Sequence, residues 1–144
     1  MIDEKLKAEF KGLLSKEGMK MTTARLAVLD NILSSNEHRE CEEICNSLIK
    51  KKVKISRATT YRTLDVLVKY DYIRKLDIGD GKIRYEKKLG NPHHDHMICI
   101  ETGDIIEFYN EAIETLQDKI AKNHGYEVIR HVHQLFVKPI KKNN

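Results

Sequence analysis

A change from helical to strand periodicity near residue 72 limits the fold of this chain more than any other feature. Two short β runs, Tyr72–Ile78 and Lys82–Glu86, flank a Gly-Asp-Gly turn and predict a hairpin. Before them, apolar residues recur at helical spacing in four segments, at about 3–15, 22–33, 40–51 and 56–69. The first part of the chain therefore predicts a helical bundle followed by a β-hairpin.

Helices followed by a β-hairpin are the elements of the winged helix-turn-helix, a common DNA-binding fold. The helix that Ser56 caps is the candidate for the major groove. Its apolar stripe holds Tyr61, Leu64, Leu67 and Val68, which leaves Ala58, Thr59, Arg62 and Lys69 facing outward. Such residues at a helix N-terminus suit base edges and phosphates. An ordinary solvated face, with Arg62 paired to Asp65 and Tyr61 in the core, explains the pattern equally well.

The pattern changes again after Lys87–Pro92, a connector that contains Gly90 and Pro92. A second hairpin over 97–109, a helix over 111–123 closed by His124-Gly125, and a last strand over 126–137 are predicted. This unit has about 50 residues, too few for a comfortable core of its own, so dimerisation or metal would have to stabilise it. We expect an α+β protein: a winged-helix domain (1–86), a hinge (87–92) and a small α/β dimerisation domain (93–144).

Four consecutive residues that can bind metal, His93-His94-Asp95-His96, open the C-terminal part. Each of these side chains needs solvent or a partner wherever it lies. Neighbouring side chains alternate between faces in an extended segment. His94 and His96 then point one way, and His93 and Asp95 point the other. The tetrad therefore predicts contributions to two separate metal sites.

Other imidazole and carboxylate groups can complete these sites. Glu107 lies in the strand expected to pair with the one after His96, and Glu86 ends the first hairpin. Glu114 falls on the last helix and His131 on the last strand. Taken singly, each of these residues, like His38, is more often an ordinary surface or structural group. As a set they suit iron, manganese or zinc.

Composition excludes several classes of protein. A net charge of +4 over 144 residues is too small to indicate a nucleic-acid partner by itself. There is no apolar run near the roughly 20 residues that a membrane span needs, and no signal-peptide pattern. The three cysteines, Cys41, Cys45 and Cys99, form no C-x-x-C pair. We therefore expect a cytoplasmic protein without a cysteine zinc site.

Three motifs occur in order along the chain: Gly18-Met-Lys-Met-Thr-Thr-Ala-Arg, Ala58-Thr-Thr-Tyr-Arg-Thr-Leu, and His93-His-Asp-His-Met-Ile-Cys with Glu107-Phe108 after it. Together they resemble the ferric uptake regulator family of metal-responsive repressors. The first is similar to the family's G-x-K-x-T-x-x-R segment and the second to its A-T-V-Y-R-x-L recognition helix. The similarity covers nearly the whole chain.

The resemblance implies a homodimeric repressor of iron or manganese uptake genes that binds a palindromic DNA operator, and neither an enzyme nor a protein with an organic cofactor. Fe(II) or Mn(II) would be the effector, with Zn(II) possible at either metal site. The regulatory site would consist of His38, Glu86, His94, His96 and Glu107, and the second site of His93, Asp95, Glu114 and His131. DNA contacts would come from Lys20, Arg25, Tyr61 and Arg62, beside Ala58 and Thr59 from the helix pattern.

The chain departs from the family at Cys99, which has Thr102 three residues on where many members carry a zinc-binding C-x-x-C pair. We expect that zinc site to be absent and the cysteines to be buried apolar residues. Glutamates at 86 and 107 favour a regulator of iron or manganese uptake over peroxide-sensing relatives, while a peroxide- or zinc-sensing regulator of the same family stays an alternative. A metallohydrolase and a zinc-storage protein are alternatives from other classes, although no motif for a catalytic base or substrate is visible.

Overall fold

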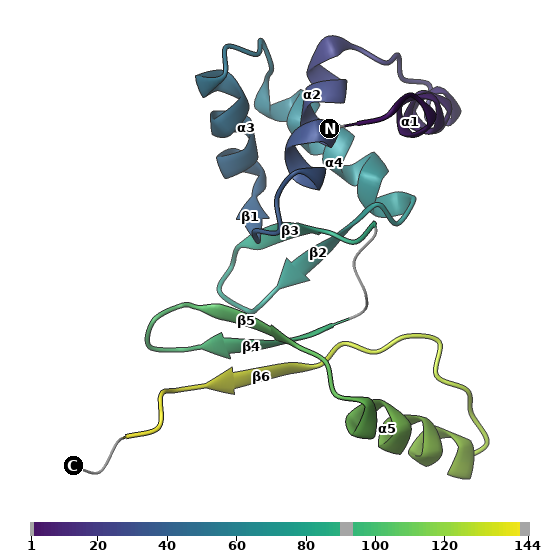
Figure 1. The fold of residues 1–144 in the computed structure, drawn as a ribbon, viewed down its shortest axis with the longest axis vertical. Coiled ribbons are helices and arrows are strands. Elements are labelled where there is room, and N and C mark those ends of the chain that lie inside the picture. Colours follow the sequence, from purple (N-terminus) through teal and green to yellow (C-terminus); the bar gives the residue numbers. More distant parts are fainter. Residues whose placement is uncertain (1, 90–93, 142–144) are drawn as a thin grey trace. The chain divides into compact units, whose positions relative to one another are not determined.

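The computed structural model describes residues 2–89 and 94–141 of the chain. It consists of two compact units, an N-terminal unit (Met1–Pro92) and a C-terminal unit (His93–Asn144). Each has a three-stranded sheet of its own (Figure 1). The expected α+β fold is confirmed. No helix within the described ranges is long and apolar enough to cross a membrane.

Four helices form most of the N-terminal unit, and side-chain caps start the second and the fourth of them, the one at Ser56 as predicted. The side chains of Thr22 and Ser56 accept hydrogen bonds from the backbone N–H groups of Arg25 (3.2 Å) and Thr59 (3.1 Å). The elements in chain order are α1 (Glu4–Lys16), α2 (Thr23–Leu33), β1 (Arg39–Glu40), α3 (Cys41–Lys50), α4 (Arg57–Lys69), β2 (Ile73–Asp77) and β3 (Ile83–Lys87).

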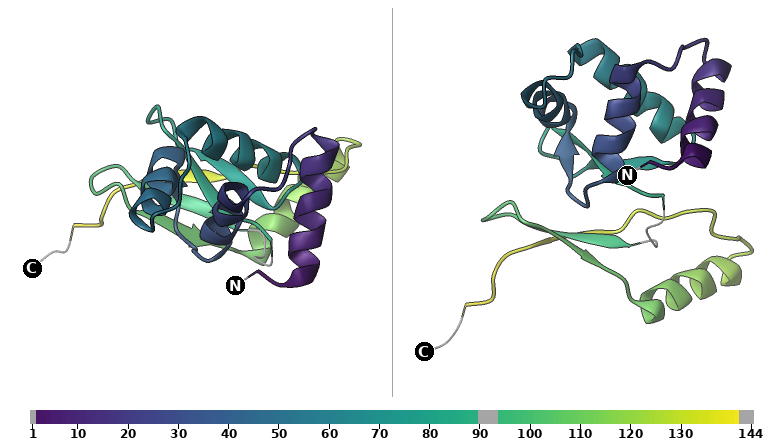
Figure 2. Two further views of the ribbon diagram at one scale, coloured as in Figure 1. Left: turned by 90° about the horizontal axis from the view of Figure 1, so that it is seen from above. Right: turned by 45° about the horizontal axis from the view of Figure 1, so that its top comes forward.

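One hydrophobic core lies among these helices and the inner face of the hairpin (Figure 2). Its completely buried residues are Phe10, Leu14, Val28, Leu29, Ile32, Ile44, Leu64 and Leu67. The sheet order is β1-β3-β2 with antiparallel pairing throughout. Gly79 and Gly81 take positive φ angles in the turn between β2 and β3, as such a turn requires. The helices and hairpin form the expected winged helix-turn-helix.

Two details of the N-terminal unit differ from the expectations. The two-residue strand β1 was not predicted, because so short a segment carries no periodic signal. Tyr61 is 46% exposed rather than inward, and Thr60 and Thr63 occupy the buried face of α4 instead. Both threonine hydroxyls donate to backbone carbonyls one turn back, so they are buried without losing a hydrogen bond.

The C-terminal unit contains β4 (Asp95–Cys99), β5 (Ile105–Phe108), α5 (Glu111–Asn123) and β6 (Gln134–Val137). β4 is central, antiparallel to β5 and parallel to β6. The prediction of one long strand over 126–137 was wrong: only its last four residues pair. Among the described residues, the pairing of this segment with β4 begins at Gln134, so apolar alternation alone does not make residues 126–133 a strand.

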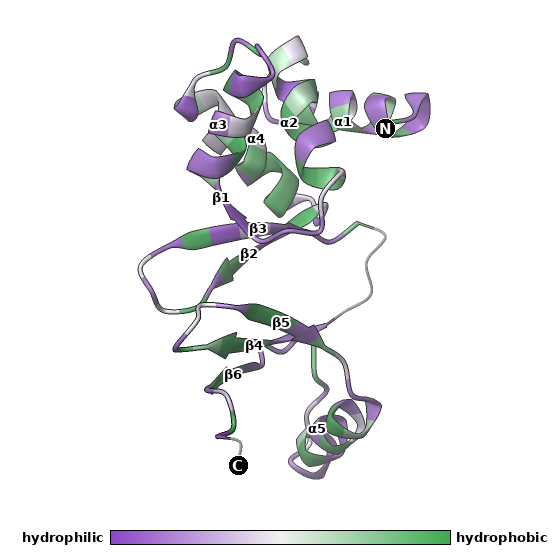
Figure 3. Ribbon diagram, turned by 60° about the vertical axis from the view of Figure 1, so that its left-hand side comes forward, coloured by the Kyte–Doolittle hydropathy of each residue, from purple (hydrophilic) through white to green (hydrophobic). Residues whose placement is uncertain are grey.

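Much apolar surface of the C-terminal unit faces solvent. Helix α5 has no buried residue, and Leu116 and Ile120 are 59% and 52% exposed. Figures 1 and 2 show this helix standing away from the three strands of its unit. Hydrophobic colour marks one side of α5 and much of β4 and β5 (Figure 3). A unit with so little enclosed core needs another source of stability.

Candidate metal and nucleic-acid sites

Two of the predicted metal ligands meet in the N-terminal unit; we refer to His38 and Glu86 as the N-terminal pair. The imidazole Nε2 of His38 lies 2.6 Å from Glu86 Oε2. His38 lies five residues beyond the end of α2, directly before β1. Glu86 lies in β3 and is 2% exposed. A buried carboxylate of this kind requires a cation or proton donors.

Arg74 supplies a second contact to Glu86. Its Nε lies 3.2 Å from Glu86 Oε1. The two residues are cross-strand partners in the β2–β3 register. The contact of Arg74 with Glu86 was not predicted from the sequence, although counting outward from the Gly-Asp-Gly turn pairs the two residues. The carboxylate therefore faces one histidine and one arginine within its own unit.

Three further ligands meet in the C-terminal unit; we refer to His94, His96 and Glu107 as the C-terminal trio. One potential ligand atom from each lies within 4.8 Å of the others. His94 Nε2 is 3.5 Å from Glu107 Oε1, and the two imidazole rings are 4.9 Å apart. His96 and Glu107 are direct partners in the β4–β5 register, as the predicted hairpin required.

A separate group in the same unit contains Asp95, Glu114 and His131. His131 Nε2 lies 2.7 Å from Asp95 Oδ1 and 3.4 Å from Glu114 Oε1. Asp95 belongs to β4, Glu114 to α5, and His131 to the connector before β6 rather than to a strand. His93, the fourth predicted member, lies outside the described residues. The division of the tetrad between two groups follows from the alternation along β4.

The donor chemistry of both groups fits a first-row transition metal. Each combines imidazole nitrogen with carboxylate oxygen, which iron, manganese and zinc all accept. Hydrogen-bonded ion pairs would account for a single contact such as that of His131 with Asp95. They account less well for three potential ligand atoms that converge within 4.8 Å in each group. The residues present therefore fit a bound metal ion.

The outer face of α4 carries the predicted DNA-contacting residues. Ala58, Tyr61 and Arg62 are exposed, and Thr59 is partly buried. Asp65 lies 3.7 Å from Lys75 of β2, whereas the alternative interpretation, an ordinary solvated helix face, pairs Asp65 with Arg62. Arg57, the first residue of the helix, is held by Glu42 of α3. The side chains that could reach a base edge or phosphate thus share one exposed surface.

Lys20 lies three residues before α2, and Arg25 lies in the first turn of that helix. The Arg25 guanidinium donates a 2.5 Å hydrogen bond to the backbone carbonyl of Lys20. Arg25 therefore fixes the loop that presents Lys20. The guanidinium has further N–H groups, and the phosphate contact that the resemblance implies would use these.

The three cysteines are buried free thiols in the described part of the chain. Burial raises the pKa of Cys41 to about 11, so this thiol stays protonated at neutral pH. A hydrogen bond from Thr102 lowers the pKa of Cys99. Thr102 thus bonds to the sulfur at the position where a C-x-x-C pair would have its second cysteine.

Comparisons with known proteins agree with this geometry. The model of the ferric uptake regulator family matches residues 16–136. A ferric uptake regulation protein of Rhizobium leguminosarum is 36% identical over 132 residues, 92% of each chain. The structure of the Helicobacter pylori ferric uptake regulator, described as having three functional metal-binding sites, superposes with a TM-score of 0.85 at 32% identity, over 94% of this chain and 90% of that one. A zinc-bound manganese uptake regulator superposes with a TM-score of 0.66 at 35% identity, over 91% and 98%.

Proposed function

Since this chain belongs to the ferric uptake regulator family of metal-responsive transcription regulators, we propose that it represses iron or manganese uptake genes by binding their operators when metal is bound. Family members are DNA-binding regulators and not enzymes, so the metallohydrolase alternative is set aside. The site of action would be the cytoplasm, where chromosomal DNA is accessible.

The observation that carries the proposal is that each unit holds an incomplete set of metal ligands. The N-terminal pair offers two donors and the C-terminal trio offers three. A transition metal in a protein takes roughly four to six donors, so neither set alone is sufficient. We propose that His38, Glu86, His94, His96 and Glu107 bind one ion together. The ion would supply a cross-link between a DNA-reading unit and a dimerisation unit.

Dimerisation would occur through the C-terminal unit. The exposed apolar stripe of α5 and the apolar surface of its sheet are larger than a monomeric unit of this size normally leaves in solvent. A second copy of the chain would cover them in a symmetric interface. The second set of Asp95, Glu114 and His131, with His93, would then stabilise the C-terminal unit around its own ion.

Repression would follow from a shift in the positions of the two reading units of the dimer. Residues 87–92 would serve as the hinge. Within the N-terminal unit, Glu86 is held by His38 and Arg74. Moving a population from mostly open to mostly closed needs a differential binding free energy on the order of a few kcal/mol. Closed units would present both α4 helices to adjacent major grooves.

The proposal also concerns which metal ion is the effector. Relatives named for iron and for manganese uptake match the chain at nearly the same identity, 36% and 35%. The donor set accepts Fe(II), Mn(II) and Zn(II) alike. We propose Fe(II) or Mn(II) as the effector and keep Zn(II) as the alternative at either site.

The test is operator binding at controlled free metal concentration. A duplex selected from a random library by metal-loaded protein would serve as the probe in fluorescence anisotropy. In the presence of a chelator we expect no specific binding. One of the three metals, Fe(II) kept anaerobic, Mn(II) or Zn(II), should restore binding at a lower free concentration than the other two. Substitution His96→Ala should abolish the metal-dependent part, because it removes one imidazole of the C-terminal trio.

The matched control is His124→Ala, which removes an exposed histidine outside both ligand groups. It should bind the duplex as the wild type does. The proposal would be overturned if the wild type bound the selected duplex equally well with and without metal. It would also fail if His96→Ala kept the full metal response.

A further inference from the structure

The position of His38 depends on a strand of only two residues. In β1, Arg39 pairs with Tyr85 and Glu40 with Arg84 of β3. Continuing that antiparallel register by one residue places His38 opposite Glu86, which is the pair observed at 2.6 Å. A one-residue slip of β1 would turn the imidazole to the other face of the sheet. So short a strand holds its register weakly, and other contacts must fix it.

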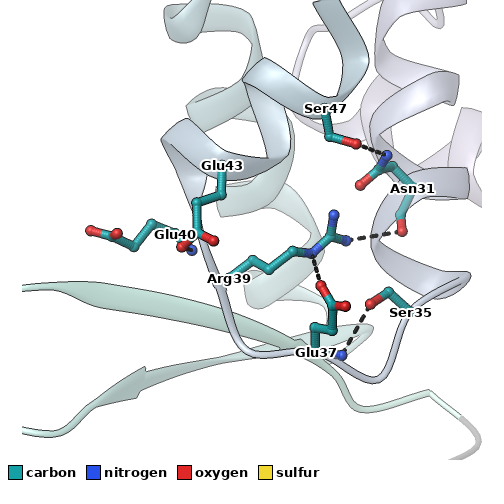
Figure 4. Close-up of polar contacts among 7 residues, drawn as sticks. All are labelled: Asn31, Ser35, Glu37, Arg39, Glu40, Glu43 and Ser47. Atoms are coloured by element: carbon teal, nitrogen blue, oxygen red, sulfur yellow. Dashed lines mark hydrogen bonds and ion pairs between the residues drawn. The ribbon is translucent and has the colours of Figure 1, made fainter. Parts of the chain in front are cut away.

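Arg39 makes the contacts that span this segment and the end of α2 (Figure 4). Its guanidinium Nη2 donates a 3.1 Å hydrogen bond to the backbone carbonyl of Asn31 in the last turn of that helix. Its Nε lies 3.8 Å from the carboxylate of Glu37. The side chain is only 12% exposed. A cation at the carbonyl end of a helix is favourably placed, because those carbonyls have no partners within the helix.

Residues near Arg39 make further polar contacts among α2, β1 and α3. The amide of Asn31 donates to Ser47 Oγ at 3.3 Å, which ties α2 to α3. On the other side of β1, the side chain of Glu43 accepts the backbone N–H of Glu40 at 3.2 Å in a capping box that starts α3. Polar contacts therefore bind β1 at both ends, as Figure 4 shows.

A hollow of about 350 Å³ lies between α2, α3 and the segment before β1, and Arg39, Asn31 and Ser47 line it. Close packing is therefore interrupted on this side of the segment, where the polar contacts of Arg39 hold it. Burial lowers the pKa of Arg39 from its usual value. Because an arginine stays charged in proteins, this buried guanidinium needs its acceptors.

We propose that Arg39 is a positioning residue for the metal ligand His38: by bonding to the end of α2 it holds the β1 register that sets this imidazole opposite Glu86. The inference rests on the proposed regulatory site and adds a residue that does not touch the metal. A ligand that must be ordered during binding gives a weaker site than one held ready beforehand. Loss of the Arg39 contacts should therefore weaken metal binding while leaving every ligand in place.

The test uses the full-length dimer with Co(II) as the probe, titrated by visible absorption in a Glu114→Ala background that weakens the second set. Substitution Arg39→Met keeps side-chain length and removes the donors. We expect it to weaken Co(II) binding roughly tenfold and to alter the intensity of the metal's absorption bands, which report the coordination number. His38→Ala should weaken binding at least as much. Arg39→Lys, with one cationic donor, should recover part of the affinity.

The matched control is Arg57→Met, which removes an arginine that also pairs with a glutamate but lies outside the β1–β3–β2 sheet. It should leave Co(II) affinity near that of the wild type. The positioning role is overturned if Arg39→Met binds Co(II) like the wild type, or if Arg57→Met weakens binding equally. Should His38→Ala leave the affinity unchanged, the regulatory site itself is wrong and the role of Arg39 is lost with it. If Arg39→Met does not fold, Arg39→Gln, which is shorter and uncharged, takes its place, and wild-type affinity and absorption bands in that variant would equally contradict the proposal.

Discussion

At the scale of single residues, the alternation of side chains along β4 divides the metal chemistry of the chain. His94 and His96 meet Glu107 on one side, and Asp95 meets His131 on the other. A strand permits this because neighbouring side chains are on opposite faces, so one tetrapeptide can serve two ions without competition between them. A helix would bring residues three and four apart together instead, and would mix the two groups.

The exposed residue Arg62 gives a prediction at the same scale. Substitution Arg62→Ala should weaken operator binding roughly 10- to 100-fold, because an arginine at a base edge or phosphate contributes on the order of 1–3 kcal/mol. Metal affinity should not change, since Arg62 is absent from both ligand groups. Anisotropy with the selected duplex and a Co(II) titration would measure the two effects.

Lys50→Ala is the control for Arg62→Ala, because it removes an exposed positive charge from the end of α3 instead. Lys50→Ala should weaken operator binding much less than Arg62→Ala does. Equal losses for the two substitutions would mean that overall charge, and not a contact of α4, explains the effect of Arg62.

At the scale of elements, helix α5 has an apolar stripe that a partner surface would cover. Ile113, Leu116 and Ile120 form one stripe, and no residue of the helix is buried in the single chain. Asn110 caps its N-terminus through two backbone N–H groups, so local signals define the helix without any tertiary packing. Its stability in the protein would come from the surface that covers the stripe.

Placing a charge on that stripe should dissociate the dimer. Leu116→Glu is expected to raise the dimer dissociation constant by roughly 10- to 100-fold or more, because a buried carboxylate without a partner is costly. Sedimentation velocity across protein concentrations would measure it.

Thr115→Glu is the control for Leu116→Glu, since it introduces the same charge on the opposite side of α5. It should sediment as the wild type does. A Leu116→Glu protein that remained dimeric at the same concentrations would exclude α5 from the interface.

At the scale of the whole molecule, the important property is the division into two units, each with its own sheet. The N-terminal unit has a complete core and an exposed reading helix, while the C-terminal unit exposes much of its apolar surface. The ligands proposed for the regulatory site come from both units. Metal binding at that site would change how the units are arranged without unfolding either one.

This division predicts a change in solution shape on metal binding. Small-angle scattering of the dimer should give a smaller and narrower distribution of interatomic distances with metal than in chelator, because the cross-link restricts the units. His96→Ala should not show this narrowing, whereas Glu114→Ala, which affects only the second set, should retain it. Identical scattering of the wild type with and without metal would contradict the switch.

The sequence by itself determined the elements with strong local signals. The helix caps at Ser56 and His124, the turn at Gly79 and Gly81, and the opposite faces of Asp95 and His96 all follow from interactions a few residues long. Those signals sufficed for the α+β fold, and the motifs sufficed for the family.

Only the tertiary structure determined features that depend on pairing between distant segments. The two-residue strand β1 exists because β3 lies beside it, and the last strand is short because its pairing with β4 begins only at Gln134. The contacts of Glu86 with His38 and Arg74, and of Arg39 with the end of α2, are of the same kind. Periodicity reports which face of a segment is apolar, and it contains no information about which segment will meet that face.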